Sequence, residues 1–243
     1  MPVNPDSQRS RGRPALPLDR ILAAALEILD EQGADALSMR SLAQRLESGT
    51  ATLYRHFANR SELVAMLVEH ILGEIDVDAQ AVAELPWRQT CMLFARQMFE
   101  ALGRHGNVAP LLIGHVPIGP NALAGRELCL SALLDNGFAP SVAAHAYATL
   151  ARYVLGFAIQ LSGSTSARAD QEAEGDAEAS AAFHHLDPSR YPATVAVADE
   201  LPVPLEEEFE FGLRLIVAGL ERLQGSTHPE AAEVFDHGVD RGL

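Results

Sequence analysis

Apolar residues recur along most of the chain with the three-to-four-residue spacing of amphipathic helices. The pattern predicts a helix over residues 17–33, a short helix that begins after Ser38, and a third helix over residues 50–56. A capping box at Asn59 opens a fourth helix, which extends to about residue 75. No segment shows the alternation typical of a strand. We therefore expect an all-helical (all-α) fold.

The second half of the chain predicts longer and more apolar helices, at about residues 87–103, 121–136, 141–161 and 204–223. Between the first two of these, residues 104–120 contain six glycines and prolines and leave room for only one short turn. The stretch 141–161 is long enough to span a membrane. However, it contains His145, Arg152 and many alanines, so we interpret it as a closely packed helix of a protein without membrane contact.

The pattern divides the chain into two domains with extended ends. Residues 1–16 are expected to form a flexible basic arm with Arg11 and Arg13, and residues 225–243 a C-terminal tail. Between them we place a small three-helix domain with its connecting helix at 17–75 and a larger helical domain at 76–224. Within the larger domain, residues 163–190 are expected to form an acidic, solvated loop because their side chains have little apolar surface to bury.

Composition narrows the possible functions. The 243 residues are 48% hydrophobic, enough for a sizeable core, and two cysteines exclude a disulfide framework or a four-thiolate zinc site. The net charge of −15 argues against a nucleic-acid partner, but residues 1–60 hold eight of the eighteen arginines against seven acids. The N-terminus lacks the apolar core of a signal peptide, so we expect a cytoplasmic protein.

A short helix, a tight turn and a second short helix, packed on a longer first helix, form a helix-turn-helix arrangement. The second helix must present a solvent-facing side that fits the major groove of DNA. Leu53 and Phe57 would face inward, and Arg40 and Arg60 would bind phosphates at two helix starts. Arg20 and Arg45 are interpreted as solvated charges. The groove-facing candidates are Thr50, Ala51, Thr52, Tyr54, Arg55 and His56.

The same residues carry a family resemblance. The runs that carry it are Arg11-Gly-Arg-Pro, Ile21-Leu-Ala-Ala-Ala-Leu-Glu-Ile-Leu, Leu37-Ser-Met-Arg-Ser-Leu-Ala-Gln-Arg-Leu, Thr52-Leu-Tyr-Arg-His-Phe and Asn59-Arg-Ser-Glu-Leu. This segment resembles the DNA-binding domain of the TetR (tetracycline repressor) family. The resemblance implies a homodimeric transcriptional regulator that binds a palindromic DNA operator. The family's DNA-contacting positions fall on Arg40, Thr50, Ala51, Thr52, Tyr54, His56 and Arg60.

One departure from the family pattern lies in the turn. The family usually has Leu-Gly-Val there, whereas this chain has Leu46, Glu47 and Ser48. We expect the missing glycine and the serine at a buried position to cost about 1–2 kcal/mol of local stability. Glu47 also places a negative charge near DNA, which predicts a lower operator affinity.

The remainder resembles the C-terminal domain of tetracycline-repressor-type members. The resemblance implies that the helices near 141–161 and 204–223 pair with their copies in a four-helix dimer interface, and that a small-molecule effector binds among the helices. The runs that carry it include Trp87, Gly114-His-Val-Pro, Pro120-Asn-Ala-Leu, Leu133-Leu-Asp-Asn-Gly-Phe, Tyr153-Val-Leu-Gly-Phe-Ala and Phe209-Glu-Phe-Gly-Leu-Arg-Leu-Ile. The family's effector-contacting positions fall on Asp76, Phe94, Met98, Leu112, His115, Val116, Pro117 and Gln160.

The departures among these positions bear on the effector. The tetracycline repressor holds a magnesium–drug chelate with a His and with a Glu of the partner subunit, and those places are Leu112 and Gln160 here. Neither side chain is an anionic or imidazole ligand. We therefore expect no metal and no cofactor, and a largely apolar organic inducer.

Two other classes of protein stay open at this point: a helical enzyme and an interaction module that does not bind DNA. The chain has no His-x3-His, Gly-x-Ser-x-Gly or phosphate-binding glycine loop, and His184-His185 follows an acidic run that is expected to be exposed. An enzyme is therefore not expected. Within the regulator class, a repressor and an activator of the same fold are both compatible with the sequence, and repression is the commoner activity in the family.

Overall fold

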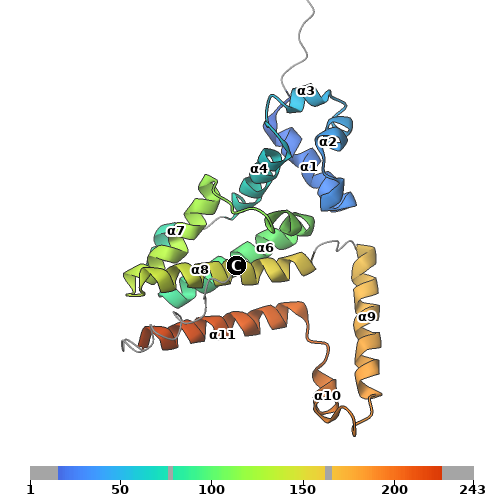
Figure 1. The fold of residues 1–243 in the computed structure, drawn as a ribbon, viewed down its shortest axis with the longest axis vertical. Helices are drawn as coiled ribbons and strands as arrows, with labels where there is room; N and C mark the ends of the chain where they lie inside the picture. The colour runs from blue at the N-terminus through green and yellow to red at the C-terminus, as the bar shows by residue number, and fades with distance from the viewer. Residues whose placement is uncertain (1–15, 76–78, 162–165, 226–243) are drawn as a thin grey trace, which may run out of the picture.

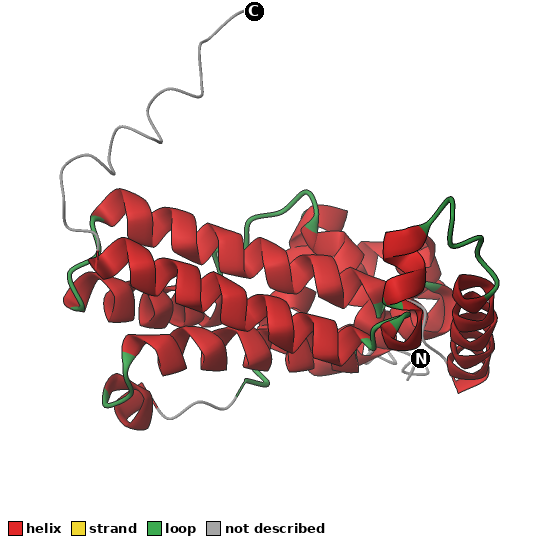
Figure 2. Cartoon of the chain, turned by 90° about the horizontal axis from the view of Figure 1, so that it is seen from below, coloured by secondary structure: helices red, strands yellow, loops and turns green. Residues whose placement is uncertain are grey.

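The computed structural model describes residues 16–75, 79–161 and 166–225. All regular structure in these ranges is helical, which confirms the all-helical prediction (Figures 1 and 2). A small N-terminal domain stands on one side of a larger C-terminal domain, and α4 leads from the first into the second (Figure 1). The predicted arm with Arg11 and Arg13 lies outside the described residues, as does the tail.

The N-terminal domain follows the predicted helices closely. It consists of α1 (Leu18–Gln32), the 3-10 turn η1 (Ala34–Ala36), α2 (Met39–Arg45), α3 (Thr50–Leu53) and α4 (Arg60–Leu72). Helix α3 is shorter than expected, since the chain continues as a turn to residue 56. The core is made of side chains that are at most 1% exposed: Ile21, Ala25, Leu29, Leu37, Leu42, Leu53, Phe57, Leu63, Val64, Leu67 and Ile71.

Local hydrogen bonds explain where α2 and α4 begin. The Ser38 hydroxyl accepts a hydrogen bond from the Ser41 amide at 3.0 Å, and the Ser41 hydroxyl accepts one from the Ser38 amide at 2.9 Å, which completes a capping box. Asn59 caps α4 with its side-chain oxygen, which accepts from the Glu62 amide at 3.0 Å, but the predicted capping box is not complete, because the Glu62 carboxylate accepts from the Ala58 amide, one residue earlier. These caps fix the chain direction just before α2 and just after the α3 segment (residues 50–57).

The C-terminal domain is built around α6. Its long helices lie side by side (Figure 2), and α6 packs against α7, α8 and α11. The elements are α5 (Ala79–Ala83), α6 (Trp87–Arg104), η2 (Gly106–Leu112), α7 (Pro120–Asp135), α8 (Pro140–Gln160), α9 (Ser166–His184), α10 (Pro192–Ala196), η3 (Ala198–Glu200) and α11 (Leu205–Gly225).

The prediction of an acidic loop at 163–190 is wrong for most of its length, because residues 166–184 form helix α9. The segment has little apolar surface, but alanine and glutamate are among the strongest helix formers, and that local preference decides its conformation. The C-terminal end of α9 is tied to η3, where His184 Nε2 lies 2.8 Å from Asp199 Oδ1. In Figure 1, α9 stands across the direction of α8 and α11.

Helix α8 is long and apolar enough to span a membrane by length and composition. In the structure it packs against α6, α7, η2 and α11. Its small residues permit this packing: Ala143, Ala146 and Ala158 are buried among the neighbouring helices. The contacts agree with the interpretation of this stretch as a packed helix.

Candidate DNA-binding and effector-binding sites

One face of the α3 segment is exposed to solvent, and the opposite face packs into the core of the N-terminal domain. Leu53 and Phe57 are 0% and 1% exposed, whereas the Tyr54 side chain is 55% exposed. Thr50, Ala51 and Arg55 are exposed as well, and Thr52 and His56 are half-buried. The structure thus brings the predicted groove-facing residues together on one accessible surface, as entry into the major groove requires.

The turn before α3 keeps the geometry of a Schellman motif without its glycine. The Ser48 amide donates to the Ala43 carbonyl at 2.9 Å, and the Glu47 amide donates to the Gln44 carbonyl at 3.1 Å. Glu47 has φ of 47°, the left-handed conformation that glycine adopts most readily. The Ser48 hydroxyl is buried with no hydrogen-bond partner among the described residues. Both features are the local costs that the sequence predicted.

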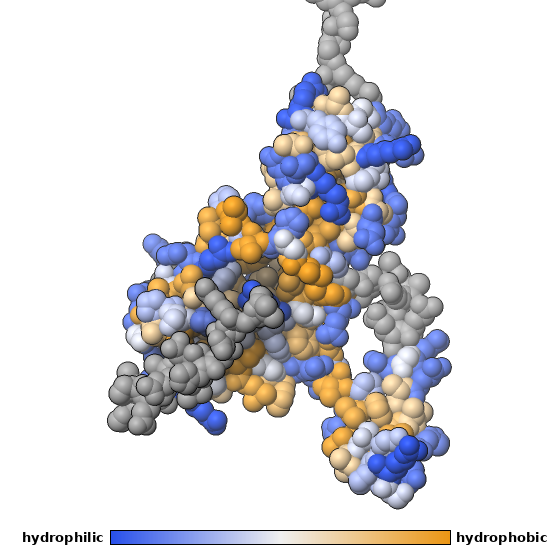
Figure 3. Space-filling view, in the orientation of Figure 1, coloured by the Kyte–Doolittle hydropathy of each residue, from blue (hydrophilic) through white to orange (hydrophobic). Residues whose placement is uncertain are grey.

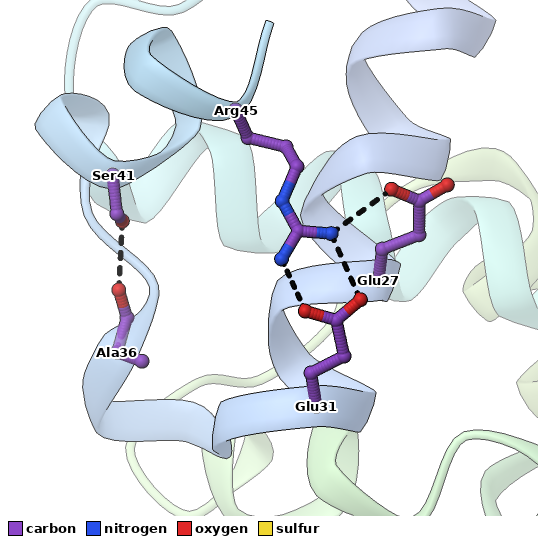
Figure 4. A network of polar contacts seen from close by, with 5 residues as sticks. All are labelled: Glu27, Glu31, Ala36, Ser41 and Arg45. Carbon is purple, nitrogen blue, oxygen red and sulfur yellow. Dashed lines mark hydrogen bonds and ion pairs between the residues drawn. The ribbon is translucent and has the colours of Figure 1, made fainter.

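Polar contacts brace α2 against α1 (Figure 4). Arg45 Nη1 donates to Glu27 at 3.1 Å and to Glu31 at 3.0 Å, and Nη2 makes a further bond to Glu31. The Ser41 hydroxyl donates to the Ala36 carbonyl at 2.7 Å. Arg45 is therefore not the solvated charge that we expected: its guanidinium joins the C-terminal end of α2 to α1.

Arg60 contributes to the scaffold as well. Its Nε donates to the Leu37 carbonyl at 2.8 Å and its Nη2 donates to the Ala34 carbonyl at 3.2 Å, which ties the start of α4 to η1. Arg40 is exposed at the start of α2. Phosphate binding by Arg40 and Arg60 stays a prediction, and the guanidinium of Arg60 would meet a phosphate with some of its N–H groups already engaged.

A cavity of about 570 Å³ lies in the C-terminal domain, within the size range of small-molecule sites. Its walls come from the end of α4, from α6, from the η2–α7 segment, and from α7 and α8. The lining residues are Leu72, Ile75, Leu93, Phe94, Gln97, Met98, Leu112, Ile113, Gly114, His115, Val116, Pro117, Asn121, Ala122, Ala124, Gly125, Arg126, Leu128, Tyr147, Ala148, Ala151, Arg152 and Leu155.

Six of the eight predicted effector-contacting residues line this cavity: Phe94, Met98, Leu112, His115, Val116 and Pro117. Gln160 does not line it, which is compatible with the resemblance, since that position acts from the partner subunit in the family. Asp76 lies outside the described residues. Three polar lining residues, Arg126, Tyr147 and Arg152, were not among the predicted positions. Arg152 stood out in an otherwise apolar helix, but it was weighed only as evidence against a membrane span.

Helix α4 touches both sites. Leu72, its last residue, and Ile75, three residues beyond it, line the cavity. One turn earlier, the Glu69 carboxylate accepts hydrogen bonds from the amides of Asn121 and Ala122 at the start of α7, and the Asn121 side chain donates to the Glu69 carbonyl at 3.0 Å. A carboxylate at a helix N-terminus is electrostatically favourable. A change in the cavity wall can therefore reach α4 directly.

A second polar contact joins the domains beside α6. His105 lies between two acids, with Nε2 3.4 Å from Glu74 and Nδ1 3.9 Å from Asp30 of α1. Arg104 also lies 3.4 Å from Glu74. Burial raises the pKa of Asp30, and the neighbouring His105 partly offsets that effect. In Figure 3, apolar side chains gather where the two domains meet.

Comparisons with known proteins agree with this architecture. The family "Bacterial regulatory proteins, tetR family" matches residues 21–67, and the "Tetracyclin repressor-like, C-terminal domain" matches residues 83–224. The chain belongs to the TetR family of bacterial transcriptional regulators. It is a ligand-responsive transcriptional repressor of that family, not an enzyme.

The relatives cover nearly the whole chain. An HTH-type transcriptional regulator of Saccharopolyspora erythraea is 30% identical over 90% of this chain and 90% of its own length. The HTH-type transcriptional repressor DrrR1 of Streptomyces coeruleorubidus is 30% identical, with 92% and 84% covered. The structure is similar to that of ActR, a TetR family protein of Streptomyces coelicolor crystallised in complex with actinorhodin: the TM-score is 0.76 at 31% identity, with 89% of this chain and 100% of that chain covered.

Proposed function

We propose that this chain acts as a cytoplasmic homodimer that binds a palindromic operator through two copies of α3 and is released by a small, largely apolar organic inducer. The observation that carries the proposal is the pairing of an exposed α3 face with a connecting helix, α4, that also forms part of the cavity wall. In this proposal the base edges are contacted by the groove-facing residues of the α3 segment, Thr50, Ala51, Thr52, Tyr54 and His56. The phosphates are contacted by four arginines: Arg40, Arg60 and the arm residues Arg11 and Arg13.

The dimer is supported by an unpartnered apolar surface. Helices α8 and α11 pack on each other, yet Phe211 and Leu215 of α11 are 59% and 58% exposed. A Cβ added at Gly156 of α8 or Gly219 of α11 would meet no atom within 4 Å, so both glycines border open space. Large exposed apolar side chains beside small residues are typical of a helix–helix interface. Two copies of this surface would form the four-helix interface that the family resemblance implies.

Release of DNA follows from the position of α4. Two recognition helices must lie about 34–36 Å apart to enter successive major grooves of one palindrome. An inducer that binds better to a dimer with a different separation shifts the population away from DNA. Leu72 and Ile75 would contact the inducer, and Glu69 would transmit a displacement of α7 to α4. ActR in complex with actinorhodin supports an organic molecule as the ligand class. The proposed inducer does not bind through a metal, because Leu112 and Gln160 provide neither an anionic nor an imidazole ligand.

The test for DNA binding uses the full chain and the DNA that flanks its own gene, in gel-shift titrations at two salt concentrations. A specific complex that weakens steeply with salt is expected. Tyr54→Ala should lower the affinity by about tenfold or more. Tyr191→Ala is the matched control, since Tyr191 is similarly exposed at 44% but lies beside α10. A chain that forms no sequence-specific complex, or a Tyr54→Ala variant equal to wild type, would refute this part.

The test for the dimer is light scattering coupled to size exclusion. We expect twice the chain mass for the wild type, and a monomer that no longer binds the palindrome for Phe211→Glu. A wild-type chain that stays monomeric at micromolar concentration would refute the proposed assembly, whatever its affinity for DNA.

A further inference from the structure

The charge of the cavity wall is opposite to that of the rest of the molecule. The chain contains 33 acidic residues and 18 arginines. Among the described residues that line the cavity, however, there are two arginines, Arg126 of α7 and Arg152 of α8, and no aspartate or glutamate. Arg126 is half-buried and Arg152 is exposed, and a cationic side chain that faces a mostly apolar cavity is stabilised by an anion bound there. The imbalance indicates that the occupant of the cavity supplies negative charge.

Neither arginine has a carboxylate partner within the part of the chain that the structure describes. Arg45, Arg88, Arg96 and Arg104 all form ion pairs there. Arg126 instead donates from Nη2 to the Pro117 carbonyl at 2.8 Å, which orients its guanidinium and leaves Nη1 and Nε available. A planar guanidinium that is positioned but not paired matches the two-oxygen geometry of a carboxylate.

Aromatic groups stand beside these charges. The Tyr147 ring lies 5.7 Å from the Phe94 ring, and the Arg126 guanidinium lies 5.4 Å from the Tyr147 ring centroid. Along α8, the lining positions Tyr147, Ala148, Ala151 and Arg152 recur with helical spacing and share one face. The two alanines leave little side-chain bulk between the tyrosine and the arginine, which are about 7.5 Å apart along the helix axis at the α-helical rise per residue. A flat ring system fits such a surface better than a branched aliphatic one.

We propose that the effector is a planar aromatic anion, carrying a carboxylate or an ionised phenol, whose charge is bound by Arg126 and Arg152 and whose rings lie against Phe94 and Tyr147. The proposal rests on the proposed function, since it names the chemical class of the molecule that enters the cavity. It excludes cationic aromatic compounds, which the two guanidinium groups would repel. The rest of the cavity lining is mostly apolar, so the remainder of the ligand is expected to be apolar.

The experiment measures binding directly and without DNA. Fluorescence titration of the full-length protein compares three probes of the same shape: anthracene-2-carboxylic acid, its neutral carboxamide and the cationic 2-(aminomethyl)anthracene. We expect the carboxylate to bind most tightly and the amine most weakly. Arg152→Ala and Arg126→Ala should each weaken carboxylate binding by about 10- to 100-fold, the range for a lost hydrogen bond to a charged group, and change carboxamide binding by less than about twofold.

Arg190→Ala is the matched control. Arg190 is also stacked on a tyrosine, with its guanidinium 5.6 Å from the Tyr191 ring, but it lies outside the cavity, so its removal should leave all three affinities unchanged. If loss of the Arg126–Pro117 contact impairs folding, Arg152→Ala suffices, because Arg152 is exposed at the cavity wall and lies at no such contact among the described residues.

Three results would overturn the inference: equal affinity of the wild type for carboxylate and carboxamide, a carboxylate preference that survives both substitutions, or no binding of any probe up to millimolar concentration. Operator binding by the same preparations keeps this outcome separate from the proposed function. Loss of the charge preference with intact operator binding rejects only the ligand class, whereas absence of operator binding rejects the regulator itself.

Discussion

The strained turn between α2 and α3 leads to a quantitative prediction. Glu47 occupies the left-handed position of the Schellman motif with φ of 47°. For a residue with a side chain this conformation costs about 1–2 kcal/mol. Glycine removes that cost but loses about 0.5–1 kcal/mol more conformational entropy on folding. Glu47→Gly should therefore raise the free energy of unfolding by about 0.5–1 kcal/mol, which corresponds to a Tm increase of about 1–4 °C for a chain of this size.

Thermal and urea denaturation at fixed protein concentration provide the assay, because dimerisation makes Tm depend on concentration. Two control variants isolate the cause. Glu47→Ala removes the charge but keeps the backbone cost, so it should bring no comparable gain in stability. Gln44→Gly, at an exposed position of α2, should lower stability by about 1 kcal/mol. In operator titrations, Glu47→Gly and Glu47→Ala should both strengthen binding, since each removes a negative charge beside α3.

The reasoning would be refuted if Glu47→Gly left the Tm unchanged or lowered it while Gln44→Gly behaved as expected. An equal gain from Glu47→Ala would assign the effect to charge and not to backbone conformation.

Three further predictions concern other local contacts. Ser48→Ala removes a buried hydroxyl without a partner among the described residues and should raise the free energy of unfolding by about 1 kcal/mol in urea titrations; a loss would show that the hydroxyl is satisfied. Glu69→Gln removes the charge at the start of α7 and should cost about 0.5–1 kcal/mol in the same assay, whereas an unchanged midpoint would remove Glu69 from the proposed coupling. Arg96 donates from Nε and Nη2 to Glu210, both at 2.7 Å, and holds the pKa of Glu210 below its usual value of 4.5. The stabilisation by this ion pair is therefore complete above pH 4.5, the usual pKa of a glutamate, and is lost as pH falls through the lowered pKa. The difference in unfolding free energy between wild type and Glu210→Gln should shrink in acid. A difference that grows in acid would contradict the assignment.

The N-terminal domain was predictable because its signals are local. Caps at Ser38 and Asn59, and apolar residues at helical spacing, identify helices before any tertiary contact is known. The turn was predictable for the same reason: a Schellman motif needs a left-handed residue, whichever residue type occupies the position. The prediction of a solvated charge failed at Arg45. Its partners, Glu27 and Glu31, lie in α1, too far along the chain for any local sequence pattern to reveal the contact.

At the acidic segment, the prediction failed although the deciding signal was local. The absence of apolar surface was taken to mean the absence of structure, yet α9 forms over residues 166–184 because helix propensity does not require burial. The cavity was predictable only in part. Phe94, Met98 and the η2–α7 segment were found by resemblance, whereas Arg126 and Tyr147 belong to helices whose relative rotation the sequence does not specify.

Periodicity and caps were enough to predict most of the helices, their order and the exposed face of α3, since each depends on residues a few positions apart, whereas the family was identified by its resemblance to known sequences. Folding in three dimensions decided which side chains meet across helices: the contact of Glu69 with the start of α7, and the gathering of two arginines and two aromatic rings around one cavity. The physical reason is that such contacts depend on how helices cross and rotate against one another. Many weak packing contacts throughout the chain determine that arrangement, and no single segment encodes it.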